Sequence, residues 1–73
     1  MPSKYPVLPP ERIISIMERN FGFRFVSQKG SHRKYTDGTH TFIIPMHNEI
    51  AKGTLRSILN MSGITIDEFQ KYL

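Results

Sequence analysis

Cysteine is absent from the sequence, which excludes a disulfide framework and any zinc site that depends on thiolates. Long apolar runs are missing as well, because no segment approaches the ~18 apolar residues that a membrane-spanning helix needs. Residues 1–6 lack the apolar core of a signal peptide. We therefore expect a soluble, cytoplasmic protein that makes no contact with a membrane.

The motifs of several enzyme classes are missing too. The sequence contains no P-loop, no glycine-rich dinucleotide fingerprint and no Ser-His-Asp set. Its three histidines, His32, His40 and His47, are spaced unlike any familiar zinc motif. We therefore expect neither a metal ion nor another cofactor.

What remains is a short, basic chain of 73 residues. A chain of this size folds as one domain with a thin core, because it buries only ~60% of its unfolded surface. Ten Lys and Arg residues against six Asp and Glu residues give a net charge of +4. Such a charge favours a polyanionic partner, and nucleic acid and an acidic protein are the two alternatives.

The spacing of apolar residues predicts a helix followed by three strands. Pro10 suits the first turn of a helix, and the helical period continues to residue 20. Aromatic and β-branched residues predict strands at residues 23–28, 32–36 and 39–44. We expect Asp37-Gly38 to form a type I′ hairpin turn, in which both central residues take a positive φ.

Two further helices are predicted near the C-terminus. Three apolar residues at helical spacing mark a helix that Gly63 ends, namely Leu55, Ile58 and Leu59. Thr65 and Glu68 fit a capping box, which opens a short last helix. The fold class is therefore α+β, in the order α-β-β-β-α-α, with a three-stranded antiparallel sheet and helices packed on one face. We expect an extended lead-in over residues 1–9 and a single domain over residues 10–73.

The segment 29–34 sets His32 among three cations, namely Lys29, Arg33 and Lys34. Imidazole, with an ordinary pKa of ~6.5, takes and gives protons at neutral pH, and cations stabilise charge that develops on phosphorus. This combination suggests RNA binding and RNA cleavage. The alternative is a solvated or packed strand histidine without a chemical role. Gly30 and Ser31 either contact phosphate or only shape the turn.

Alternation along the strand decides which of these side chains reach solvent. It places His32 and Lys34 on one face and Ser31, Arg33 and Tyr35 on the other. If Tyr35 packs beneath the helices, His32 and Lys34 emerge on the uncovered face, and Arg33 must leave at the sheet edge. We expect four phenylalanines to fill the core, namely Phe21, Phe23, Phe25 and Phe42.

A second candidate cluster lies at the start of the predicted second helix. The first amides of a helix lack backbone partners, so Gly53 and Thr54, beside Lys52, can hold a phosphate oxygen. Lys52, Arg56 and Asn60 share one face of that helix. The alternative is an ordinary helix start with a solvated outer face.

Several short motifs follow one another along the chain. They are Gly30-Ser31-His32 with Tyr35, then Pro45 and His47, Gly53-Thr54-Leu55-Arg56, and finally Gly63-Ile64. In this order and spacing they resemble the HicA family of mRNA interferase toxins. The resemblance implies a fold like that of double-stranded RNA-binding domains (dsRBD-like) and a role as the toxin of a type II toxin–antitoxin system. It also implies that His32 is essential for RNA cleavage and that a HicB-like antitoxin neutralises the toxin.

The chemistry of RNA cleavage agrees with this resemblance. RNA carries its own nucleophile, the 2′-hydroxyl, so cleavage needs a base, an acid and charge stabilisation at phosphorus, but no metal. We predict a metal-independent endoribonuclease that cuts mRNA or other single-stranded RNA with His32 as catalytic residue and His47 as a possible second member. The expected RNA-binding residues are Lys29, Gly30, Ser31, Arg33, Lys34, His47, Lys52, Gly53, Thr54 and Arg56. The alternatives are a non-catalytic RNA-binding module of the same fold and a basic face that docks an acidic protein.

Overall fold

The computed structural model describes residues 4–73 of the chain. Its elements are α1 (Pro10–Asn20), β1 (Arg24–Lys29), β2 (His32–Thr36), β3 (Thr41–Pro45), α2 (Lys52–Ser62) and α3 (Ile66–Gln70). The predicted α+β class and the α-β-β-β-α-α order are confirmed, and they are consistent with a dsRBD-like fold. Within the described residues, no helix has the length and apolar character needed to cross a membrane.

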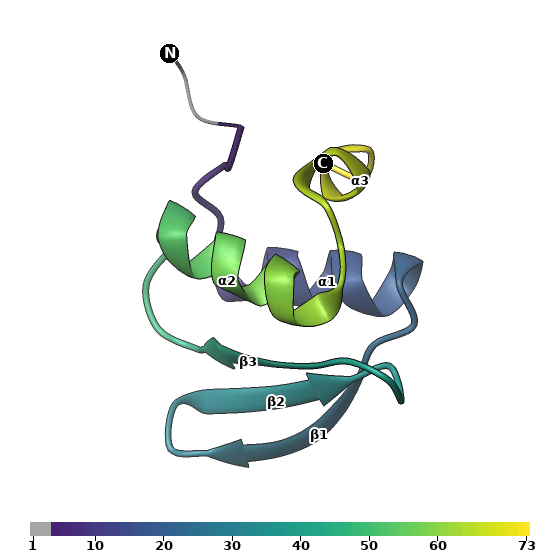
Figure 1. The fold of residues 1–73 in the computed structure, drawn as a ribbon. Helices are drawn as coiled ribbons and strands as arrows, with labels where there is room; N and C mark the ends of the chain where they lie inside the picture. Colours follow the sequence, from purple (N-terminus) through teal and green to yellow (C-terminus); the bar gives the residue numbers. More distant parts are fainter. Residues whose placement is uncertain (1–3) are drawn as a thin grey trace.

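The three strands form an antiparallel sheet in the order β1-β2-β3. Figure 1 shows all three helices on the same side of this sheet, with β3 nearest to them and β1 farthest away. The opposite face of the sheet carries no helix in this part of the chain. A two-layer arrangement of this kind leaves one sheet face open to solvent, as the sequence predicted.

The core lies between the helices and the covered face of the sheet. Tyr35 and Phe42 point into it from β2 and β3 and are 2% and 0% exposed. Their rings stack with centroids 5.4 Å apart and planes inclined by 12°. Met17 and Leu55 close the core from α1 and α2. Truncating a phenylalanine buried in this way typically costs about 3–5 kcal/mol of stability.

The expectation that all four phenylalanines fill the core is wrong for Phe25. Its side chain is 52% exposed, because it lies on the edge strand β1, which the helices do not cover. The ring meets Tyr35 edge-on, with ring centroids 5.8 Å apart. Phe21 is half-buried and packs against the core and, edge-on at 5.4 Å, against Tyr72. Phe23 and Phe42 are buried as predicted.

The predicted type I′ turn at Asp37-Gly38 is also wrong. Gly38 has a φ of 98°, whereas Asn48 is the one non-glycine residue with a positive φ in the described chain, so Asp37 lacks the required conformation. The connection spans four residues, 37–40, and β3 begins at Thr41. The Asp37 side chain explains the longer loop. Its Oδ1 accepts hydrogen bonds from the backbone amides of residues 39 and 40, which stabilises a four-residue connection in place of a two-residue turn.

The lead-in packs against the rest of the fold. Leu8 pairs with Ile50 in an isolated antiparallel bridge, and the side-chain Nε2 of Gln70 donates to the carbonyl of Lys4 at 2.6 Å. Residues 1–3 of the predicted lead-in lie outside the described residues. The division into a lead-in and a domain beginning at residue 10 stays a prediction.

Candidate nucleic-acid interface

A two-residue turn, Gly30-Ser31, joins β1 to β2 and places His32 at the start of β2. Gly30 has a φ of 60°, a conformation that glycine adopts without strain. The side chain of Gln28 donates to the Gly30 carbonyl at 2.9 Å and accepts from Arg33 Nε at 3.1 Å. These bonds order the turn. They also direct the Arg33 side chain toward the edge strand β1, where it reaches solvent as the sequence analysis expected.

A β-bulge at Val26 determines which way the end of β1 faces. Phe25 pairs with Tyr35 and points to the helix side of the sheet. In a regular strand, residues 27 and 29 would point to that same side. The extra residue reverses the alternation, so Ser27 and Lys29 point to the open face.

The open face is hollowed around His32. The hollow has a volume of about 610 Å³ and is lined by Ser27, Lys29, Gly30, His32, Lys34 and Ile43. His32 lies between Lys29 on β1 and Pro45 on β3, and the next position along the same face of β2 is Lys34, which pairs with Ile43. His32 and Lys34 are exposed while Tyr35 is buried, so the predicted faces of these three residues are confirmed, whereas Ser31 belongs to the turn.

Positive charge in this hollow is not neutralised by neighbouring acids. None of the six lining residues is acidic. Within residues 4–73 the ion pairs are Lys4 with Asp67 and His40 with Asp37, and neither involves a residue of the hollow. The ammonium groups of Lys29 and Lys34 therefore remain available to an incoming anion, beside an imidazole that can transfer protons.

A second, separate hollow lies at the start of α2, beside the second predicted cluster. His47 and Thr54 line it together with Pro45, Asn48, Glu49, Ile50 and Ala51, around a volume of about 190 Å³. No side chain caps the first turn of α2, and that turn contains no acidic residue, which leaves its first amides open to an anion. The carboxylate of Glu49 in the same hollow works against anion binding. Lys52, Gly53 and Arg56 are exposed beside this hollow on α2 without lining it.

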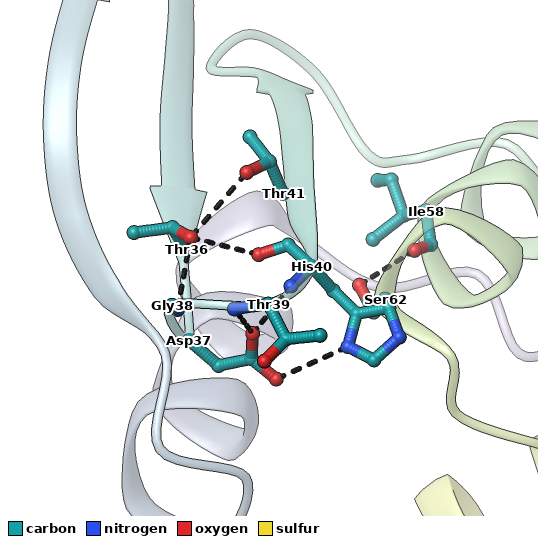
Figure 2. A network of polar contacts seen from close by, with 8 residues as sticks. All are labelled: Thr36, Asp37, Gly38, Thr39, His40, Thr41, Ile58 and Ser62. Carbon is teal, nitrogen blue, oxygen red and sulfur yellow. Dashed lines mark hydrogen bonds and ion pairs between the residues drawn. The ribbon is translucent and has the colours of Figure 1, made fainter.

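A polar network fixes the loop between β2 and β3 (Figure 2). This loop follows Thr36, whereas His32 begins the same strand. Asp37 Oδ1 accepts the His40 amide at 2.6 Å and the Thr39 amide at 2.8 Å, and Asp37 Oδ2 lies 3.3 Å from His40 Nδ1. The hydrogen bond from the backbone amide of His40, followed in size of effect by that from Thr39, holds the pKa of Asp37 below its ordinary value of 3.8. The hydroxyl of Thr36 donates to the His40 carbonyl at 2.8 Å.

The three histidines do not form a common site. His32 lines the larger hollow, His47 lines the smaller one, and His40 belongs to the loop network. Across residues 4–73, no three side chains among the histidines and acids are grouped so that they could hold a metal ion. The structure thus brings His32 together with Lys29, Gly30 and Lys34, and keeps the α2 cluster apart from them.

Comparison with known families agrees with these motifs. A family model described as the HicA toxin of bacterial toxin–antitoxin systems matches residues 10–64. The chain belongs to the HicA toxin family. As a HicA toxin it is the toxic component of a toxin–antitoxin pair, with an antitoxin protein as partner. The matched range contains every motif that carried the resemblance, from Gly30 to Ile64. No curated protein matched the chain.

Sequence reasoning missed two residues that line the main hollow of this HicA toxin, Ser27 and Ile43. Ser27 could not be predicted, because regular alternation would place it on the covered face together with Phe25, and only the bulge turns it to the open face. Ile43 had a detectable signal. It alternates with Phe42 and Ile44, which are buried, so the sequence could have placed it on the open face beside Lys34.

Proposed function

We propose that this HicA toxin is a metal-independent endoribonuclease, an mRNA interferase that cuts single-stranded RNA on the open face of its sheet. A HicB-like antitoxin neutralises it, and the cytoplasm is its place of action. The observation that carries the proposal is the hollow in which His32 lies beside Lys29 and Lys34 without an acidic neighbour. Family membership supports the same conclusion.

The proposed reaction uses the 2′-hydroxyl of RNA as nucleophile. The 2′-oxygen attacks the adjacent phosphorus and loses its proton to a base, while the bond from phosphorus to the 5′-oxygen breaks and that oxygen receives a proton. The products are a 2′,3′-cyclic phosphate and a 5′-hydroxyl. His32 performs one of the two proton transfers, and the ammonium groups of Lys29 and Lys34 stabilise the charge on the phosphorane.

The second proton transfer requires another group, and His47 is our candidate. The two hollows are separate, but Pro45, which lines the hollow of His47, pairs with His32 across the strands. An RNA strand that passes from one to the other would approach the free amides at the start of α2. We infer an RNA path along Lys29, Gly30, Ser31, Arg33, Lys34, His47, Lys52, Gly53, Thr54 and Arg56. Within this set Arg33 is the least favourably placed, because Gln28 holds it on the covered side of the sheet.

The test is incubation of the purified protein with a defined single-stranded RNA, followed by analysis of the new ends. We expect a 2′,3′-cyclic phosphate, cleavage that persists in EDTA, and no cleavage where the scissile nucleotide carries deoxyribose. Cleavage of the deoxy substrate would instead indicate an activated water, and loss of activity in EDTA would indicate a metal. RNA binding without any cleavage would favour a non-catalytic RNA-binding module.

A further inference from the structure

Ile43 is an exposed apolar residue in a setting that is otherwise cationic. Its side chain is 47% exposed on the open face, and it is the one aliphatic hydrocarbon side chain among the residues that line the main hollow. A single exposed isoleucine on a convex surface would need no explanation. Here it forms part of a concave site that Lys29 and Lys34 also line, and the hydrocarbon stem of a lysine can extend an apolar surface while its charged end stays in water.

The register of the sheet places Ile43 next to the proposed catalytic histidine. Ile43 pairs with Lys34, and Pro45, two residues further along β3, pairs with His32. Ile43 and His32 are therefore diagonal cross-strand neighbours on the same face, about 7–8 Å apart between backbones. A ligand that reaches both must offer an apolar surface and, within about 7–8 Å of it, an anionic group. A nucleotide has this chemistry.

We propose that the hollow is a base-binding subsite in which an unpaired nucleobase beside the scissile phosphate lies against Ile43. The scissile phosphate then contacts His32, and the side chains of Lys29 and Lys34 flank this phosphate. Ser27, whose hydroxyl makes no hydrogen bond within the described chain, lies within the same hollow and can contact the edge of the base. This inference rests on the proposed ribonuclease function, and it adds the residue that positions the substrate.

The subsite also explains why the substrate would be single-stranded. A base in a duplex is stacked on both faces and paired along its edge, so it cannot lie on a side chain of the protein. A free strand exposes these surfaces, and its bases can be splayed out one at a time. An acidic peptide would satisfy the lysines, but its carboxylates would leave the apolar surface of Ile43 without a partner.

Binding measurements with an uncleavable RNA test the subsite independently of catalysis. The probe is a labelled single-stranded oligonucleotide with deoxyribose at the scissile position, titrated with the full chain. Ile43→Thr keeps the β-branched shape and should weaken binding about 3–10-fold, below the effect of losing an aromatic platform. Ile43→Tyr should tighten binding. Val7→Thr is the matched control, because Val7 is equally exposed, at 48%, in the lead-in, and it should change nothing.

A second titration identifies the base. Removing a single base from the oligonucleotide should weaken binding to the wild type at one of the two nucleotides that flank the scissile phosphate. The same abasic RNA should bind Ile43→Thr with no further loss. The subsite would be refuted if Ile43→Thr and removal of the base each weakened binding by the same factor whether or not the other change was present. It would also be refuted if Ile43→Thr, folded and melting like the wild type, bound the intact RNA with unchanged affinity.

The two proposals fail in different ways. If RNA with normal ribose is cut but Ile43 and the base show no coupling, the subsite is refuted and the ribonuclease stands. If the coupling is present but the same RNA is never cut, the subsite stands as part of a binding module and the ribonuclease is refuted. Loss of antitoxin binding in Ile43→Thr, without coupling to RNA, would assign the hollow to protein docking and refute the subsite.

Discussion

The imidazole of His40 lies against the backbone of Gly63, so that a β-carbon at position 63 would come 2.7 Å from His40 Nε2. Gly63 also ends α2 in the left-handed conformation, with a φ of 69°. The left-handed conformation therefore favours glycine at this position, and a β-carbon would in addition force the His40 imidazole to shift. The contact joins the loop between β2 and β3 to the C-terminal end of α2, and Asp37 holds the imidazole from the other side.

Gly63→Ala should destabilise the fold by about 1–3 kcal/mol from the backbone conformation alone, with the contact to His40 as an added cost. Removing the imidazole should relieve only this second part. We expect Gly63→Ala to cost less stability in a His40→Ala background than in the wild type, as measured by urea unfolding of all four proteins. Strictly additive losses would show that the two residues do not interact.

Asp37 should make stability depend on acid pH. Because folding lowers the pKa of its carboxyl below 3.8, the carboxylate stabilises the folded state above that pH. This contribution is lost as the pH falls through the lowered pKa. Asp37→Asn keeps an oxygen acceptor but cannot ionise. The variant should therefore be less stable than the wild type at about pH 5, and this difference in unfolding free energy should shrink as the pH falls to about 2. A deficit that stays constant over this range, followed by urea unfolding, would contradict the assignment.

Lys52 and Arg56 lie one turn apart on α2, so we expect them to contact the RNA backbone at a distance from the chemistry. Replacing both with alanine should weaken RNA binding and flatten its dependence on salt by about 0.7–0.9 in log–log slope for each lost contact. The cleavage rate of the saturated complex should barely change. Lys71→Ala removes one exposed charge beyond α3 and serves as the control. An unchanged slope in the double variant would mean that this face of α2 is only solvated.

Elements with local signals could be predicted from the sequence. Pro10 begins α1, Gly63 ends α2, and the reciprocal hydrogen bonds of Thr65 and Glu68 form the predicted capping box. Each of these features depends on residues within one helical turn, so neighbouring residues contain the necessary information. The face on which His32 lies was also predictable. Side chains alternate along a strand, so His32, three residues before the buried Tyr35, must point to the opposite face.

Features that depend on strand pairing or on competing side chains could not be predicted. The bulge at Val26 is a property of the register between β1 and β2, and it turns Lys29 toward His32. The Asp37 side chain binds backbone amides and thereby replaces the expected two-residue turn. Phe25 is exposed because the helices end short of the edge strand, which the composition of that strand does not indicate.

If His32 performs a proton transfer in RNA cleavage, its replacement by alanine must slow the cleavage step without unfolding the protein. His32 is exposed at the end of a strand, so the variant should melt like the wild type while its single-turnover rate on saturating RNA falls about 10²-fold to 10⁴-fold. His40→Ala, which removes an imidazole at the other end of β2, should retain nearly full activity at a temperature where it is folded. Cleavage at the wild-type rate by a folded His32→Ala protein would show that His32 is not catalytic.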